Sequence, residues 1–326
     1  MRKSVFLHAI AFELGVAKPI AGIGSVAIRE GVIDNFLRNG LRDYRETEST
    51  PVQLATSCIV RTMALAGLLP DQIDALIYAS NSFSEPGRFA REISQAMSEL
   101  GLWRLAPIGV TMSECANFAT ALRIAHGLVA SEGLKRVILV TTDVCPTDDA
   151  RLVPSVTVLS DGAASCLVTD EHVEGFEILA MEHAANHQLR AIDPERESIR
   201  MFRSTAAEIR RCAGRALARC SMQPDQLTAL VFNNLSRSVL QLYAAQCQVD
   251  WSRVYANVAE MGHVYAADAL INLDGARRSR GYEGAVFMLV VNGICCWGSI
   301  ILAVTDARCK DKVMVDGPSV GNGAPS

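Results

Sequence analysis

The sequence predicts an α/β protein made of two similar halves, each a mixed sheet covered by helices, with one half layered upon the other. Two observations predict this fold class. Four short segments of the first half return in the same order in the second half. Within each half, short apolar runs typical of buried strands alternate with longer segments of helical spacing. The chain of 326 residues, 50% hydrophobic and 20% charged, is long enough for a large core.

The repeats place the two halves at 1–172 and 173–308, followed by a polar tail, 309–326, that we expect to be flexible. The segment PDQIDALIY at 70–78 returns as PDQLTALVF at 224–232, and 132–143 parallels 283–293. CxxxAxAL starting at Cys115 is echoed by HxxxAxAL starting at His263. Gly162 with VTD at 168–170 matches Gly298 with VTD at 304–306. Single matches of this kind arise by chance, but their shared order favours duplication.

The individual elements follow from residue type and spacing. Runs rich in β-branched and aromatic residues, bounded by Gly, Asp or Asn, predict buried strands at 75–80, 136–142, 166–170, 229–234 and 285–293. Apolar residues at helical spacing, ending near Gly or a turn, predict helices at 51–67, 117–133 and 205–220.

Charge and cysteine content limit the partners and the compartment. Lys+Arg 31 against Asp+Glu 35 gives a net charge of -4, which removes a whole-protein electrostatic case for binding nucleic acid or an anionic membrane. Glu13 and Lys18 interrupt the N-terminal apolar stretch before a signal peptide or spanning helix could form, so we expect a cytoplasmic protein. The ten cysteines sit mostly in apolar runs without CxxC spacing, which predicts free thiols and no metal site.

Cys115 and His263 are the first candidates for chemistry. If the halves are related by a pseudo-twofold axis, these residues take equivalent places at the starts of equivalent helices and face each other. A helix N-terminus favours a thiolate, and an imidazole beside it supplies the base that covalent catalysis requires. The alternative is a structural cysteine and a hydrogen-bonded core histidine.

Several motifs resemble the β-ketoacyl-acyl-carrier-protein synthase III group of condensing enzymes and its natural-product acyltransferase relatives. They are the residues at 40–42, GLLPDQIDALIYAS at 67–80, ECANFATAL at 114–122, LSDGAAS at 159–165, PDQLTALVFNN at 224–234 and NGICCWGS at 292–299. The resemblance implies the internally duplicated, five-layered α-β-α-β-α thiolase-like fold and a homodimer. It also implies acyl-carrier-protein or coenzyme A thioesters as substrates, with no permanently bound cofactor.

The resemblance also implies a catalytic set of Cys, His and Asn. Cys115 matches the first position. Asn233 stands where the family has His, and His263 stands where the family has Asn, so the two have exchanged places. The exchange alters the distances on which decarboxylation depends. We therefore expect transfer of an acyl group through a Cys115 thioester to a hydroxyl, an amine or a keto-acid carbanion, in secondary metabolism.

Two alternatives to that function remain. One is decarboxylative condensation with a malonyl thioester, with the exchanged pair still functional. The other is a non-catalytic subunit that pairs with an active homologue.

The remaining site residues follow from the resemblance. Gly293 matches a glycine whose N–H, with that of Cys115, resembles an oxyanion hole; its alternative is a turn glycine. A basic face for a carrier protein or coenzyme A is expected from Arg203, Arg210, Arg211 and Arg237, with a solvated helix face as the alternative for most of them.

Overall fold

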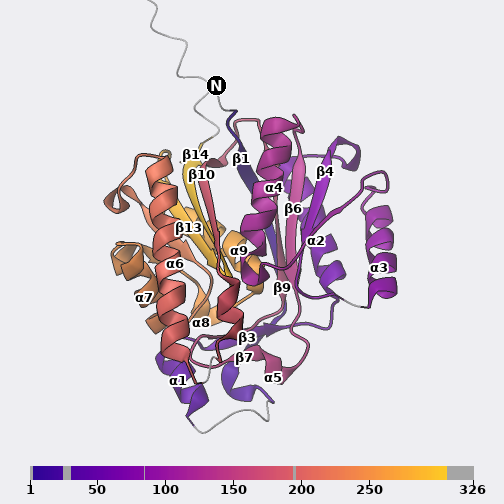
Figure 1. Ribbon diagram of the computed structural model, residues 1–326. Coiled ribbons are helices and arrows are strands. Elements are labelled where there is room, and N and C mark those ends of the chain that lie inside the picture. Colours follow the sequence, from indigo (N-terminus) through magenta and orange to yellow (C-terminus); the bar gives the residue numbers. More distant parts are fainter. Residues whose placement is uncertain (1–2, 25–30, 84, 194–195, 307–326) are drawn as a thin grey trace, which may run out of the picture.

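A computed structural model describes residues 3–24, 31–83, 85–193 and 196–306. The expected tail, 309–326, and with it Cys309, lies outside these residues. The described chain forms a mixed α/β structure around a ten-stranded sheet with the order β12-β11-β13-β14-β10-β1-β9-β6-β4-β5 (Figure 1). Two small two-stranded sheets, β2-β3 and β7-β8, lie outside it.

The ten strands of the large sheet are β1 (Phe6–Leu14), β4 (Ala75–Ala79), β5 (Ile108–Val110), β6 (Val137–Asp143), β9 (Gly162–Thr169), β10 (Gly175–Ala185), β11 (Ala229–Phe232), β12 (Val254–Tyr255), β13 (Val286–Asn292) and β14 (Cys296–Thr305). The small sheets contain β2 (Val16–Pro19), β3 (Asp43–Glu46), β7 (Leu152–Val153) and β8 (Thr157–Val158). The helices are α1 (Val32–Arg38), α2 (Pro51–Ala66), α3 (Pro86–Glu99), α4 (Asn117–Ser131), α5 (Asp148–Arg151), α6 (Ser198–Arg219), α7 (Arg237–Gln246), α8 (Val258–Met261) and α9 (Asp268–Arg280).

The order of the sheet is symmetric about its centre. β4 pairs in parallel with β5 and β6, and β11 pairs in parallel with β12 and β13. β9 and β14 then run antiparallel to β6 and β13. The halves are joined where β1 pairs with β10 through Phe6↔Glu177 and Leu7↔Phe176. This arrangement agrees with the duplication inferred from the repeats.

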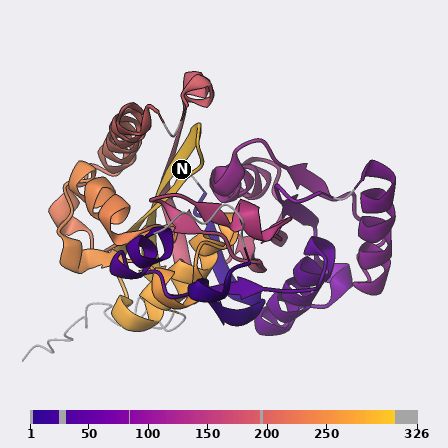
Figure 2. The same cartoon turned by 90° about the horizontal axis from the view of Figure 1, so that it is seen from below.

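The helices lie in layers around the two halves of the sheet. α4 and α9 contribute to one buried cluster together with residues of β6, β9, β13 and β14. α2 and α3 pack on the other face of the first half, and α6 and α7 on the other face of the second half (Figures 1 and 2). Strands covered on both faces must be apolar throughout, which explains why β4, β9 and β11 are buried along their whole length.

The repeated PDQ segments adopt the same local structure. Each forms a short 3₁₀ turn before a buried strand, η2 (Pro70–Gln72) before β4 and η5 (Pro224–Gln226) before β11. In each turn the glutamine side chain accepts the N–H of the residue before the proline, at 2.8 Å for Gln72 and 2.7 Å for Gln226. The sequence match therefore reflects a structural match.

Candidate active site

Cys115 lies in a tight turn directly before the central helix α4. The turn is the 3₁₀ segment η3 (Glu114–Ala116), and Glu114 has a left-handed backbone with φ 53°. The side chain of Asn117, the first residue of α4, accepts the N–H of Ser113 at 3.0 Å. Cys115 is partly exposed at this position. The turn thus presents the thiol at the N-terminal end of a buried helix, where the helix dipole favours negative charge.

The second half contains the same turn before α9. There η7 (Tyr265–Ala267) begins with Tyr265 at φ 49°, and Asp268 accepts the N–H of Val264 at 2.8 Å. Glu114 therefore corresponds to Tyr265, and Asn117 to Asp268.

This correspondence corrects the sequence register at the candidate site. Cys115 corresponds to Ala266, and His263 lies three residues earlier, so the expected equivalence of Cys115 and His263 is wrong. The error has a local cause. Both segments are rich in Ala and Leu. Their AxAL strings therefore match even when the alignment is displaced by three residues, which is almost one helical turn.

The two side chains nevertheless meet. Nε2 of His263 lies 3.1 Å from Sγ of Cys115. His263 as a whole is only 4% exposed. Its backbone is held from both sides, because the His263 N–H donates to the Val158 carbonyl at 2.8 Å and the His263 carbonyl accepts the Ser160 N–H at 2.9 Å. The structure thus places an imidazole within hydrogen-bond reach of a partly exposed thiol.

Asp268 completes this arrangement, and the sequence analysis did not identify it. Its fully buried carboxylate contacts Nδ1 of His263 through Oδ2. The same carboxylate accepts the Asn234 N–H at 2.7 Å and the Asn234 side-chain amide at 3.2 Å, besides the Val264 N–H. A bond from Nδ1–H to the carboxylate leaves the lone pair of Nε2 directed at the thiol. The available signal was an acidic residue inside the apolar segment HVYAADAL, five residues after the histidine.

The pKa of His263 is raised well above its ordinary value by this environment. Burial alone lowers the pKa, but the negative charges and hydrogen bonds of Cys115 and Asp268 outweigh burial and raise it. The imidazole is therefore stabilised in its protonated form once it has accepted the thiol proton.

Two further acidic side chains, Tyr265 and Asp143, lie near the site. The ring of Tyr265 stacks against His263, with centroids 6.1 Å apart. Burial, followed by the negative charges of Cys145, Asp143 and Cys115, raises the pKa of Tyr265. Burial also raises the pKa of Asp143 to about 6, although Asp143 accepts the Asn81 N–H at 2.7 Å.

Asn233 lies close to the turn but is held by backbone groups. Its amide nitrogen donates to the Tyr265 carbonyl at 3.3 Å, and its amide oxygen accepts the Asn292 N–H at 3.0 Å. The side chain is fully buried. These contacts tie β11 to η7 and to the end of β13, so they account for an asparagine at this position without any substrate.

Gly293 approaches the turn of Cys115 very closely. A Cβ at this position would lie 2.8 Å from the Ser113 carbonyl and 3.0 Å from the Glu114 side chain. Its own N–H, however, donates to the Cys296 carbonyl at 2.8 Å. This donor is engaged within the hairpin rather than turned toward a substrate oxygen, which differs from the expected oxyanion hole. Close packing explains the glycine.

The four arginines expected at a carrier-binding face do not form one cluster. Arg203 and Arg210 line a groove of about 590 Å³ between α6 and α7, together with Phe202 and Leu242. Arg210 donates to Gln246 across this groove at 2.6 Å. Arg211 is not among the residues lining the groove and pairs with Glu208 at 2.5 Å. Arg237 begins α7 and is also outside the lining, with its N–H bound to Asn39.

Two further properties concern the described residues only. Their nine cysteines are free thiols, and their His, Cys, Asp and Glu side chains form no group of three that could hold a metal ion. Every described helix is too short or too polar to cross a membrane.

Two family models match the chain. The model described as 3-oxoacyl-(acyl-carrier-protein) synthase III matches residues 111–186, and the model of its C-terminal part matches residues 217–304. The β-ketoacyl-(acyl-carrier-protein) synthase III of Rhodobacter capsulatus is 24% identical over 285 residues, 80% of this chain and 86% of that protein.

Solved structures share the fold. The 3-oxoacyl-(acyl-carrier-protein) synthase III of Aquifex aeolicus VF5 superposes with a TM-score of 0.77 at 17% identity, covering 92% of this chain and 99% of that one. The acyltransferase ChlB3 superposes with a TM-score of 0.77 at 15% identity, covering 93% and 98%.

Proposed function

Because the chain belongs to the 3-oxoacyl-(acyl-carrier-protein) synthase III-like family of acyl-transferring and condensing enzymes with the thiolase fold, we propose that it moves acyl groups through a thioester on Cys115. The acceptor in this proposal is a hydroxyl, an amine or the carbanion of a keto acid, in natural-product biosynthesis. The observation that carries the proposal is the contact of His263 with both Cys115 and the buried Asp268.

The first step is loading of the enzyme. His263 takes the thiol proton at Nε2, and the Cys115 sulfur attacks the carbonyl carbon of an acyl thioester. The tetrahedral intermediate collapses with cleavage of the bond to the donor sulfur, and the donor leaves as a thiol after taking the proton from His263. Asp268 holds the imidazole in the required tautomer and orientation through its contact with Nδ1.

The second step uses the change of charge that loading produces. The Cys115 thioester is neutral, so the negative charge that raised the pKa of His263 is gone while the burial that lowers it remains. The imidazole then serves as a base for the acceptor. Its Nε2 takes the proton of the O–H, N–H or acidic C–H, the acceptor attacks the acyl carbon, and the bond to Cys115 breaks.

The donor is proposed to be an acyl carrier protein or coenzyme A, used as a substrate and not held permanently. The groove between α6 and α7 supports a basic docking place, because Arg203 lines it together with the apolar side chains of Phe202 and Leu242. Phosphate or acidic groups on the donor would pair with such a cation, and the apolar lining would accept a pantetheine chain.

Intact-protein mass spectrometry tests the proposal directly. The chain is incubated with a panel of acyl thioesters on coenzyme A and on acyl carrier protein, and the acyl mass shift is followed over time. We expect a shift in the wild type and its loss in Cys115→Ala. Cys145→Ala is the matched control, because it removes a second thiol next to Tyr265 and should leave the shift intact.

The same experiment separates the two alternative functions. Release of carbon dioxide from a malonyl thioester by the loaded enzyme would identify decarboxylative condensation instead of transfer. A chain that acquires no acyl mass from any donor would be a non-catalytic subunit. A full shift in Cys115→Ala would show that another group is the nucleophile.

A further inference from the structure

The backbone of His263 is paired with a single residue of the opposite segment. Leu159, just after β8, forms an isolated parallel bridge with His263. The two hydrogen bonds of this bridge use the carbonyl of Val158 and the N–H of Ser160. The polar backbone groups of Leu159 itself therefore point away from His263 and need other partners.

Arg151 supplies both partners. The Leu159 N–H donates to the Arg151 carbonyl at 2.8 Å, and the Arg151 guanidinium donates from Nη1 to the Leu159 carbonyl at 3.3 Å. Leu159 is thus held between Arg151 on one side and His263 on the other. A displacement of Arg151 must be transmitted through one residue to the backbone of His263.

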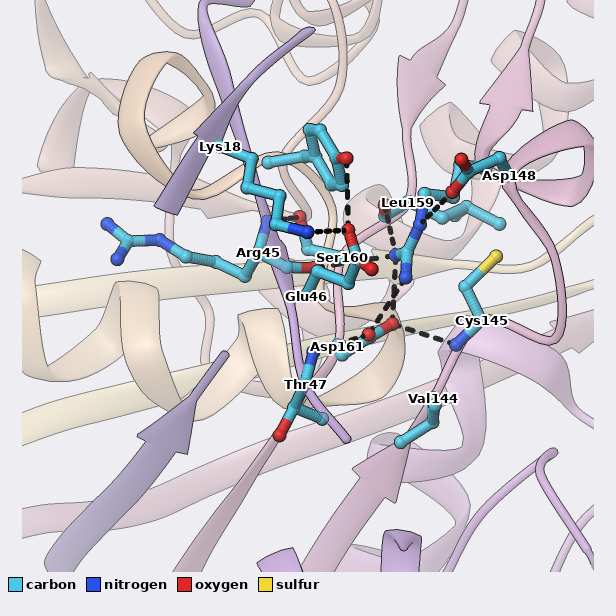
Figure 3. A network of polar contacts seen from close by, with 12 residues as sticks. Lys18, Arg45, Glu46, Thr47, Val144, Cys145, Asp148, Leu159, Ser160 and Asp161 are labelled. Carbon is cyan, nitrogen blue, oxygen red and sulfur yellow. Dashed lines mark hydrogen bonds and ion pairs between the residues drawn. The ribbon is translucent and has the colours of Figure 1, made fainter. Parts of the chain in front are cut away.

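Asp161 fixes the guanidinium of Arg151 in turn. The two side chains form a bidentate pair with both N···O distances at 2.9 Å, and they are 4% and 0% exposed. The same carboxylate accepts the N–H of Cys145 at 2.8 Å and the N–H of Thr47 at 3.0 Å. Figure 3 shows Asp161 where these segments converge, with Leu159 and Ser160 beside it.

The opposite side of the bridge leaves little room for adjustment. Gly262, directly before His263, has φ 59°, and a Cβ there would lie 2.5 Å from the Ser160 hydroxyl and 2.8 Å from the Val158 carbonyl. The Ser160 hydroxyl is itself held, since it accepts the Arg45 N–H at 2.9 Å. The segment around Leu159 and the segment around His263 therefore move together.

We propose that Arg151 and Asp161 are positioning residues for His263. Asp161 fixes the Arg151 guanidinium, Arg151 holds the backbone of Leu159 by hydrogen bonds, and Leu159 in turn sets the distance from Nε2 of His263 to the Cys115 thiol. The inference rests on the proposed function of His263. It concerns geometry alone, because neither residue contacts the thiol or the imidazole. An error of about 1 Å in such a distance lowers the rate by about a hundredfold.

The test must separate positioning from stability, because removing one member of a buried ion pair leaves an unpaired charge. The double variant Arg151→Met with Asp161→Asn removes both charges and the guanidinium hydrogen bond to the Leu159 carbonyl. It keeps the backbone bond from the Leu159 N–H to the carbonyl of residue 151 and one amide oxygen for a backbone N–H at Asp161. We expect a folded protein whose acyl loading of Cys115 is about a hundredfold slower. Arg151→Lys keeps the charge but cannot bind both Asp161 oxygens and Leu159, so we expect an intermediate loss.

A readout independent of acyl transfer is the titration of His263. Cys115 and Asp268 face the imidazole and raise its pKa, and the Tyr265 ring stacks against it. If His263 is displaced, the pKa measured by NMR of labelled imidazole falls by about one unit, and iodoacetamide alkylates Cys115 about tenfold more slowly. Arg277→Met, which breaks a partly buried pair with Glu174 in the last turn of α9, is the control and leaves both unchanged.

A wild-type titration and alkylation rate in the folded double variant would overturn the proposal, since the pair would then be structural only. If the double variant does not fold, Arg151→Lys decides in the same way. Because these two readouts need no substrate, they remain valid even if the wild type acquires no acyl mass, which would be a failure of the proposed function instead.

Discussion

Replacement of Asp268 by asparagine tests the link between the imidazole and its carboxylate with almost no change of volume. Oδ1 accepts from Val264 and Asn234, and Oδ2 accepts from the Asn234 N–H and contacts Nδ1 of His263. An amide nitrogen at the Oδ1 position would face two donors, the Val264 N–H and the Asn234 side-chain amide. At the Oδ2 position it would face one donor, the Asn234 N–H, and could itself donate to Nδ1 of His263. We therefore expect the amide nitrogen beside the imidazole.

The consequences follow from that orientation. An amide that donates to Nδ1 forces the ring proton onto Nε2, so the imidazole can no longer accept the thiol proton. Loss of the carboxylate in an analogous triad costs about 10⁴-fold in rate, so we expect loading and transfer to fall by about 10²–10⁴-fold. The unpaired N–H of Asn234 costs about 1–3 kcal/mol of stability. The pKa of His263 falls because one of the charges that raise it is removed.

Quenched time courses by intact-protein mass spectrometry give the loading rate, and calorimetry gives the stability. Asp274→Asn, on the same helix and paired with Arg278, is the matched control and should load at the wild-type rate. If Asp268→Asn loses stability but loads and transfers normally, Asp268 only accepts backbone N–H groups such as that of Val264. The reasoning that Asp268 orients His263 toward Cys115 is then refuted.

Three further outcomes are expected. His263→Ala should slow loading, but acyl-enzyme should still accumulate, because the α4 terminus assists the thiol and transfer falls further, by at least about a hundredfold. Asn233→His should not rescue transfer, and normal turnover of His263→Ala would make His263 a packing residue. Asp143→Asn should raise the free energy of unfolding at pH 7.5 by up to about 3 kcal/mol, measured by denaturant unfolding. An acid whose folded pKa is raised to about 6 stabilises the fold when protonated and loses that contribution as the pH rises from about 4 to 6, so the difference from wild type should vanish toward pH 4; a constant difference contradicts this reasoning. Light scattering should give twice the chain mass of 35.2 kDa, since β5 is an edge strand and the large apolar side chains of Trp103, before it in the sequence, and Met112, after it, are 63% and 85% exposed; a fully active monomer contradicts it.

Much of the fold could be predicted because its signals are local or periodic. Each of the five expected strand runs overlaps a strand of the sheet, namely β4, β6, β9, β11 or β13. The expected helices at 51–67 and 117–133 match α2 and α4 to within two residues at each end. α6 begins earlier than expected, at Ser198, because polar residues fill its exposed first turns and hide the helical spacing. The edge strands β5 and β12 escaped prediction because three and two residues are too few for a pattern.

The candidate site was predicted only in part. Cys115 and His263 could be paired because each precedes a buried helix in the repeat, even though the register was wrong by three residues. Asp268 was missed because its partner is set by the fold of a turn, and no spacing rule relates it to a histidine. The engaged N–H of Gly293 and the backbone contacts of Asn233 depend on strands far apart in the sequence, so residue identity alone could not reveal them.

The corrected register of the two turns also shows how the duplicated frame is divided between two roles. Under the symmetry that relates Glu114 to Tyr265, the counterpart of the thiol is Ala266 and the counterpart of the imidazole is Met112. The counterparts differ in surroundings as well, since Met112 is 85% exposed and His263 only 4%. The first turn therefore supplies a nucleophile without a base and the second a base without a nucleophile, so neither turn can carry both groups by itself.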